Sequence, residues 1–217
     1  MDENKSRFHI YKFNDQLNIG EIGEQTFLKK FDKEIESKND SREPDFRIIS
    51  TDELIELKTD NWKLSNIFSY KTKETPNLFM EQYSDYDRKT IGGPWRAKEE
   101  NCKYFIYYFI NNDIFFVFNT DLLVNVLDII TKNKSLKLIP NVKWVTAGYP
   151  IPRKILEPIA YSSDKNIACS LNECIDVLKN TIDKIDTDKY IHWAQKAFSL
   201  SVKDQMKFLN DESSRKF

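Results

Sequence analysis

The sequence predicts an α/β fold, with a mixed β-sheet flanked by helices and a helical C-terminal part. Apolar residues recur at helical spacing over residues 15–38, and short apolar runs typical of strands occupy 46–119. Helical spacing returns after residue 121 and again after residue 171. The resulting order is helix, three strands, short helix, two strands and further helices, which is typical of a sheet covered by helices.

The first helix is expected over residues 15–38, because its apolar side chains repeat every three or four positions while Glu and Lys fill the other face. A polar, turn-like stretch follows it. Three strands are expected next, at residues 46–50, 54–60 and 77–84.

A β-hairpin is the clearest local prediction. Residues 103–110 and 114–119 are aromatic and β-branched, and only Asn111-Asn112-Asp113 separates them. A short helix at 95–101 is expected before it. Helices are expected after it at 122–132, 171–185 and 189–209, with an irregular, proline-punctuated stretch at 135–165. We therefore expect a core over residues 1–120 and a helical part over 121–217, packed on the core or extending it.

Composition excludes several classes of protein. Charged residues make up 31% of the chain and leave a formal net charge of −1, so bulk charge does not indicate nucleic-acid binding, although a local basic face could provide it. His9 and His192 are far apart in the sequence, so a histidine-rich metal site is not expected. The three cysteines fit no zinc-binding spacing and indicate a reducing compartment. No secretory signal or membrane-length apolar run is present, so we expect a cytoplasmic protein with no membrane partner.

The residues that indicate a chemical function are Glu43-Pro44-Asp45, followed after ten residues by Glu56-Leu57-Lys58. Side chains alternate between the two faces of a strand, so Glu56 and Lys58 point to one side while Leu57 faces the core. A return of the chain through Thr51-Asp52 would bring Asp45 beside Glu56. Two carboxylates and one ammonium group would then share a patch at the edge of the sheet.

Such a patch is suited to a divalent cation. Two carboxylates in contact repel each other, and partial burial raises their pKa values. A bound Mg²⁺ ion removes the repulsion and prefers oxygen ligands. It could polarise a phosphodiester and activate a water, while Lys58 orients that water or stabilises developing negative charge. The alternative is that Glu56 and Lys58 form only cross-strand ion pairs on a solvated strand face.

The first helix offers another acid. Gly20-Glu21-Ile22-Gly23-Glu24 places Glu21 and Glu24 one turn apart, and either could reach the metal site, with Glu24 favoured. The glycines would let this helix approach the sheet closely.

These residues resemble the signature of the PD-(D/E)XK nuclease superfamily, with Pro44-Asp45 and Glu56-Leu57-Lys58 as the two parts of the motif. Residues 20–24 resemble the first helix of many members, including archaeal Holliday-junction resolvases. The resemblance covers roughly residues 15–120. It implies a restriction-endonuclease-like core, with Asp45, Glu56 and Glu24 as metal ligands and catalytic acids and Lys58 as the catalytic lysine.

A downstream stretch resembles phage and prokaryotic members of the superfamily. Asn77-Leu78-Phe79-Met80-Glu81 precedes Gly92-Gly93-Pro94-Trp95, and an aromatic strand follows. The resemblance implies that Glu81, or Gln82 in another register, supports the site, as Glu21 and Asp60 could. Basic and aromatic residues around the motif are candidate nucleic-acid contacts, although an ordinary soluble surface has the same composition. They are Lys63, Lys71, Lys73, Arg88, Lys89, Trp95 and Arg96.

The expected function is therefore a DNA endonuclease that depends on Mg²⁺ or Mn²⁺ and comes from a prokaryotic cell or a phage-infected host. Alternatives are an exonuclease, an RNA-cutting member, or an inactive nucleic-acid- or protein-binding module on the same fold. The last helices are expected to form either a packing element or the contact of a homodimer. The homodimer is a hypothesis drawn from the resemblance and from the aromatic residues of the last helix, because cutting both strands of a duplex is easiest with two active sites.

Overall fold

The computed structural model describes residues 13–37, 44–61 and 77–217, apart from 142, 167 and 169. Its fold is α/β, with a mixed sheet flanked by helices that include the C-terminal ones, as the sequence predicts. The helices are α1 (Phe13–Lys30), α3 (Gly93–Glu99), α4 (Thr120–Thr131), α5 (Arg153–Leu156), α6 (Leu171–Ile182), α7 (Thr187–Ser199) and α8 (Val202–Asn210). Short 3₁₀ turns lie at Ile110–Asn112, Glu157–Ile159 and Glu212–Ser214.

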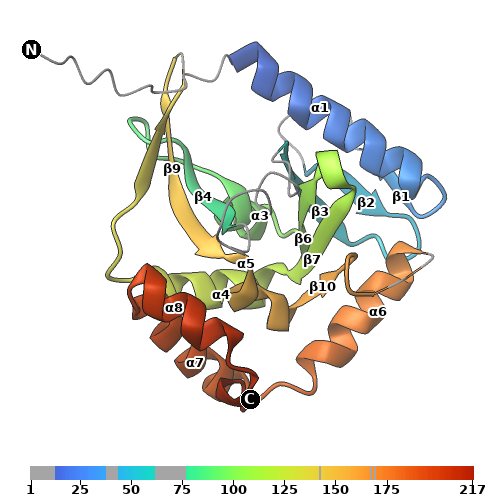
Figure 1. Ribbon diagram of the computed structural model, residues 1–217. Coiled ribbons are helices and arrows are strands. Elements are labelled where there is room, and N and C mark those ends of the chain that lie inside the picture. Colours follow the sequence, from blue (N-terminus) through green and yellow to red (C-terminus); the bar gives the residue numbers. More distant parts are fainter. Residues whose placement is uncertain (1–12, 38–43, 62–76, 142, 167, 169) are drawn as a thin grey trace, which may run out of the picture.

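The central sheet has six strands in the order β1-β2-β3-β6-β7-β10 (Figure 1). They are β1 (Ile35–Ser37), β2 (Phe46–Ile48), β3 (Leu54–Asp60), β6 (Tyr104–Phe109), β7 (Ile114–Asn119) and β10 (Ala160–Ser162). The expected hairpin is confirmed, since β6 pairs antiparallel with β7. Strand β3 runs parallel to β6, and α3 precedes β6 in the chain.

A second sheet has the order β5-β4-β9-β8, and it corrects two sequence expectations. Its strands are β4 (Asn77–Asp85), β5 (Thr90–Ile91), β8 (Lys137–Pro140) and β9 (Val145–Pro152). The expected strand at 77–84 exists as β4 but belongs to this second sheet, whereas the sequence predicts one mixed sheet. The stretch at 135–165 was wrongly expected to be irregular. Strand β8 pairs only with the first half of β9, over Val145–Gly148. Pro150 and Pro152 lie in the second half, where β9 has β4 as its one neighbour, so their missing N–H groups need no partner on the other side.

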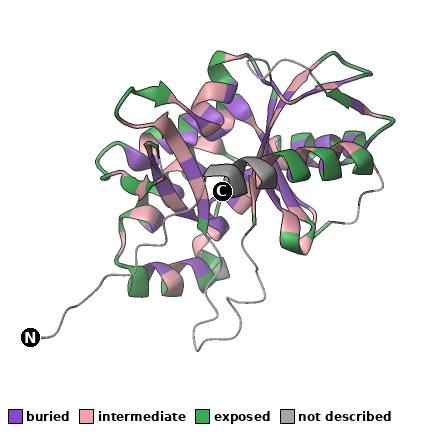
Figure 2. Ribbon diagram, turned by 90° about the horizontal axis from the view of Figure 1, so that it is seen from above, coloured by how far each residue is buried: buried purple, intermediate pink, exposed green. Residues whose placement is uncertain are grey.

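Two apolar cores cover the two faces of the central sheet. On one face, α1 and α6 pack over side chains such as Phe46, Ile55 and Tyr108. On the other, Phe105 and Phe116 belong to a core that also contains side chains from the second sheet and from α3, α4 and α7. Figure 2 shows the buried positions concentrated on the strands and the exposed ones on the outer helix faces and hairpin tips. The face that carries even-numbered β3 residues is therefore enclosed between the two sheets.

Two of the expected helices differ most from the sequence expectation. The first helix ends at Lys30 rather than residue 38, and the chain turns through residues 31–34 into β1. Phe27, Phe31 and Ile35 keep helical spacing, but Ile35 is buried by pairing with Ile48 in the sheet. The single helix expected at 189–209 is two, because Ser201 caps α8 by accepting a hydrogen bond from Asp204 N.

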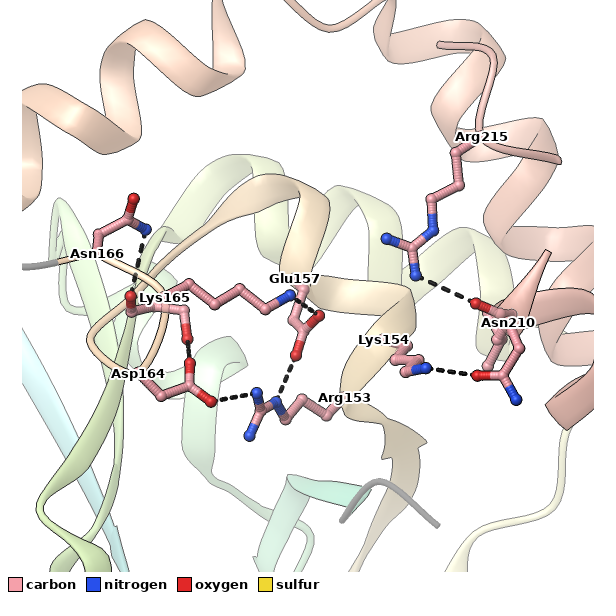
Figure 3. A network of polar contacts seen from close by, with 10 residues as sticks. Arg153, Lys154, Glu157, Asp164, Lys165, Asn166, Asn210 and Arg215 are labelled. Atoms are coloured by element: carbon pink, nitrogen blue, oxygen red, sulfur yellow. Dashed lines mark hydrogen bonds and ion pairs between the residues drawn. The ribbon is translucent and has the colours of Figure 1, made fainter. Parts of the chain in front are cut away.

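A buried ion-pair network joins α5, the 3₁₀ turn after it and the residues following β10 (Figure 3). Arg153 hydrogen-bonds to both Glu157 and Asp164, and Lys165 reaches the other oxygen of Glu157. The Arg153 side chain is 11% exposed and that of Glu157 7%. Burial raises the pKa of Glu157, but the hydrogen bonds from Lys165 and Arg153 outweigh it and leave the pKa below its usual value.

The C-terminal helices use their aromatic residues internally. Trp193, which sits in the helix that suggested a dimer, is buried, and its Nε1 donates a hydrogen bond to Ser214 Oγ at 3.1 Å. Its ring packs against Phe208 and Phe217. Across the described part of the chain, every helix is too short or too polar to cross a membrane.

Candidate metal centre

The β2–β3 hairpin places Asp45 beside Glu56. Phe46 pairs with Ile55 in the antiparallel register, so Asp45, just before β2, lies next to Glu56 on β3. The Asp45 carboxylate is fixed by a hydrogen bond of 2.8 Å from Leu57 N to Oδ2. The two parts of the sequence motif therefore meet through a local turn.

Strand β3 presents alternating side chains, as its sequence predicts. Ile55 and Leu57 are buried in the core under α1 and α6, whereas Glu56 and Lys58 point to the opposite face of the sheet. Lys58 Nζ lies 3.3 Å from Glu81 Oε2 on β4, so the two sheets are joined by this ion pair. At the end of β3, Asp60 Oδ2 accepts a hydrogen bond of 2.7 Å from Tyr107.

Helix α1 approaches β3 at one of its two glycines. A Cβ on Gly23 would lie 2.0 Å from Thr59 Oγ1, so any larger residue would push the helix off the strand. Gly20 has no atom within 4 Å of such a Cβ, so only Gly23 is needed for the close approach. Glu24 is half-buried, while Glu21 is exposed.

The carboxylates have raised pKa values in the absence of a cation. Burial raises the pKa of Glu56 to about 8, and the charges of Asp45, Glu100 and Glu24 add to the effect against that of Arg96. Burial also raises the pKa of Asp45 to about 6, although the hydrogen bond from Leu57 N opposes it. Burial and then the charges of Asp45 and Glu21 raise the pKa of Glu24 to about 7. Their ionised forms are therefore destabilised together.

Three residues beside this cluster were not assigned to it from the sequence. Arg96, on α3, donates to Glu100 Oε1 at 2.7 Å and opposes the charges of Asp45 and Glu56. Glu56, Glu100 and Cys102 have ligand atoms within 4.8 Å of one another, and they are the one such trio found among the described residues. The sequence did contain one signal for this pair, because Arg96 and Glu100 are four residues apart and so lie on the same side of a helix.

Two oxygens of that trio are unpaired. Glu56 Oε2 and Glu100 Oε2 are both buried, and neither has a hydrogen-bond partner among the described residues. Burial raises the pKa of Cys102 to about 12, so its thiol is protonated at neutral pH. The donors available without deprotonating a thiol are therefore carboxylate oxygens, which fit Mg²⁺ or Mn²⁺.

Glycines after β5 hold Glu81 in place. A Cβ on Gly92 would lie 2.6 Å from Glu81 Oε1. Gly93 has a φ of 50°, and a Cβ on it would lie 2.5 Å from the Glu81 carbonyl oxygen. Both positions therefore require glycine. Gln82, the alternative to Glu81, accepts a hydrogen bond on its backbone oxygen from Gly92 N.

The candidate nucleic-acid contacts are dispersed. Arg88 is 84% exposed at the tip of the β4–β5 hairpin, and Lys89 Nζ lies 3.4 Å above the Tyr86 ring. Trp95 donates a 2.7 Å hydrogen bond to Asp128 on α4, and Arg96 faces the carboxylate cluster rather than solvent. Lys63, Lys71 and Lys73 lie outside the described residues.

Comparison of the chain with protein-family models, with curated proteins and with solved structures found no match.

Proposed function

We propose that this chain is a metal-dependent nuclease that cuts DNA phosphodiester bonds internally. The proposal is supported chiefly by the β2–β3 hairpin, which holds the half-buried carboxylates of Asp45 and Glu56 side by side with Lys58 two residues further on β3. Two acids that bind a hard cation, next to one fixed cationic group, are the components that phosphodiester hydrolysis requires.

Asp45 and Glu56 are the proposed ligands for Mg²⁺ or Mn²⁺, with Glu24 as a further acid near Asp45. The unpaired Oε2 of Glu56 and the raised pKa values of all three carboxyl groups support this assignment, because a divalent ion would satisfy the oxygen and offset the mutual repulsion. The ion would supply charge neutralisation at the phosphate and a bound water of lowered pKa.

Lys58 acts in this proposal as a charged group and not as a proton acceptor. Glu81 raises the pKa of Lys58 above its usual value, so the amine stays protonated at neutral pH. A protonated amine cannot take a proton from water, but it can orient that water and stabilise negative charge on the phosphoryl oxygens. Glu81 then keeps Lys58 charged and in position.

The topology supports the resemblance to PD-(D/E)XK nucleases with one change of strand. The family order of helix, three strands, helix and strand corresponds here to α1, β1, β2, β3, α3 and β6. Strand β1 is one of these three family strands, although the sequence pattern had assigned its residues to the first helix. It takes the place that the sequence pattern gave to the strand at 77–84. Strand β4, which carries Glu81, is an insertion between β3 and α3 that forms a second sheet.

Arg96 favours a second candidate, an inactive nucleic-acid- or protein-binding module. Its guanidinium opposes the charges of Asp45 and Glu56, as a metal ion would. In such a module Arg96 would substitute for the ion, and binding would not depend on Mg²⁺.

Calorimetric titration with Mg²⁺, together with a substrate panel, separates these functions. The nuclease should bind Mg²⁺, bind it more weakly as Asp45→Asn, and cut at least one of supercoiled plasmid, linear duplex, four-way junction, single-stranded DNA and RNA. Circular substrates distinguish internal cutting from exonuclease activity. DNA binding without Mg²⁺ binding or cleavage would favour the inactive module.

A further inference from the structure

The connection between α3 and β6 carries two side chains that the proposed magnesium site does not use. Glu100 caps the C-terminal end of α3, and Cys102 follows after one residue. Cys102 N donates to Ala97 O at 2.8 Å, and Lys103 N donates to Leu54 O on β3 at 2.8 Å. The backbone around both side chains is therefore fixed to the helix on one side and to the central sheet on the other.

The donor atoms converge with Glu56. The carboxylates of Glu56 and Glu100 and the sulfur of Cys102 have ligand atoms within 4.8 Å of one another. Arg96 Nε donates a hydrogen bond to Glu100 Oε1. The other oxygen, Glu100 Oε2, and Glu56 Oε2 are both buried and have no hydrogen-bond partner among the described residues. Buried oxygens that lack a partner carry a desolvation cost, and a cation between them would remove it.

We propose that Glu56, Glu100 and Cys102 form a binding site for a thiophilic divalent ion such as Zn²⁺. One sulfur and two carboxylate oxygens match the mixed ligands that Zn²⁺ accepts, with a fourth tetrahedral position left for water. Mg²⁺ and Ca²⁺ would not use the sulfur. On binding, the S–H bond of Cys102 breaks, a Zn–S bond forms, and the proton leaves to solvent.

Glu56 belongs to both sites, so Zn²⁺ and Mg²⁺ would compete for it. This consequence rests on the proposed function, since it takes Glu56 as a magnesium ligand. Zinc binding itself does not rest on it, because the trio would hold the ion whether or not the chain cuts DNA.

Titration with Co²⁺, a spectroscopic substitute for Zn²⁺, tests the site without nucleic acid. The full-length protein should give a thiolate-to-metal charge-transfer absorption that Zn²⁺ displaces. Cys102→Ser should abolish this band, and Glu100→Gln should weaken the affinity by about tenfold or more, as loss of a ligand or its partner commonly does. Cys174→Ser is the matched control, because Cys174 is also a buried free cysteine but belongs to α6, which packs on the other face of the sheet.

The variants keep Cys169, so any contribution from it is constant, and circular dichroism with thermal unfolding verifies their folding. A charge-transfer band that persists in folded Cys102→Ser, or that Cys174→Ser removes instead, would overturn the site. So would the absence of any band with the unaltered protein. A chain that binds Co²⁺ through Cys102 but cuts no substrate would refute the proposed nuclease and leave the zinc site standing.

Discussion

Lys58 Nζ lies 3.3 Å from Glu81 Oε2, and this ion pair joins the central sheet to the second sheet. Lys58 is on β3 and Glu81 on β4, which share no backbone pairing. The Glu81 side chain is only 14% exposed, and the glycines at 92 and 93 pack directly on it. The ammonium group proposed to act in catalysis is therefore held by a second element of the fold.

Replacing Glu81 with Gln should change the pH dependence of DNA cleavage. Glu81 is the largest cause of the raised pKa of Lys58, so its neutralisation lowers that pKa. We expect the alkaline limb of the rate profile to move to lower pH, with a rate near neutral pH that falls by about tenfold or less. Glu99→Gln, an exposed glutamate on α3, is the control. An alkaline limb that stays in place would remove Glu81 from its positioning role.

Without divalent metal, the protein should lose stability as pH rises. The pKa of Glu56 is about 8 in the folded protein against a usual 4.5, so the folded state binds more protons between these values. The contribution of the protonated Glu56 carboxyl to the free energy of unfolding is complete below pH 4.5 and is lost as pH rises through about 8. Between pH 5 and pH 8.5 the unaltered protein should therefore lose roughly 4 kcal/mol more of its free energy of unfolding than Glu56→Gln does. Urea unfolding in chelator measures this, and a parallel pH dependence of the two proteins would contradict it.

Arg153→Ala should be strongly destabilising. The substitution removes one of the two cationic partners of the buried Glu157 carboxylate and the guanidinium that pairs with Asp164. That guanidinium also lies 5.0 Å from the Phe116 ring centre. Breaking a buried ion pair in this way costs roughly 3–5 kcal/mol. Arg47→Ala is the matched control, because Arg47 also pairs with two acids but its side chain is 39% exposed, so this substitution should cost far less than Arg153→Ala. Equal losses in chemical denaturation would show that burial does not govern the Arg153 network.

Two glycines one turn apart in α1 should respond to alanine in opposite directions. Gly20→Ala meets open space and should raise stability by about 0.5–1 kcal/mol, as alanine in a helix does. Gly23→Ala places a methyl group against Thr59 and should lower stability, and Thr59→Ala in the same chain should recover part of the loss. Thermal unfolding of these three variants and the unaltered protein tests the close contact, and a stabilised Gly23→Ala would contradict it.

The hairpin that forms the site could be predicted from local sequence. Strand β3 has the expected bounds because Leu54–Asp60 alternates apolar and polar residues, and the short turn before it allows only one arrangement with β2. Local periodicity also placed β6 and β7 correctly. Asp45 and Glu56 came together for this reason.

Long-range pairing could not be predicted in the same way. Strand β9 pairs with β4 across more than sixty positions of sequence, and its prolines read as loop signals because the one-sided pairing that tolerates them is a tertiary property. Glu100 and Cys102 join the site only because β6 runs parallel to β3, a register that no local pattern specifies. The helix break at Ser201 was different, since the Ser-x-x-Asp cap was present in the sequence.

The most direct test is the rate of supercoiled-plasmid cleavage in Mg²⁺ and in chelator, with the unaltered protein, Lys58→Ala and the exposed-lysine control Lys103→Ala. The account predicts cleavage only with metal, a loss of about 10²–10³ in rate for folded Lys58→Ala, and an unchanged rate for Lys103→Ala. Cleavage that survives chelation, or that is as fast in Lys58→Ala as in the unaltered protein, would contradict it.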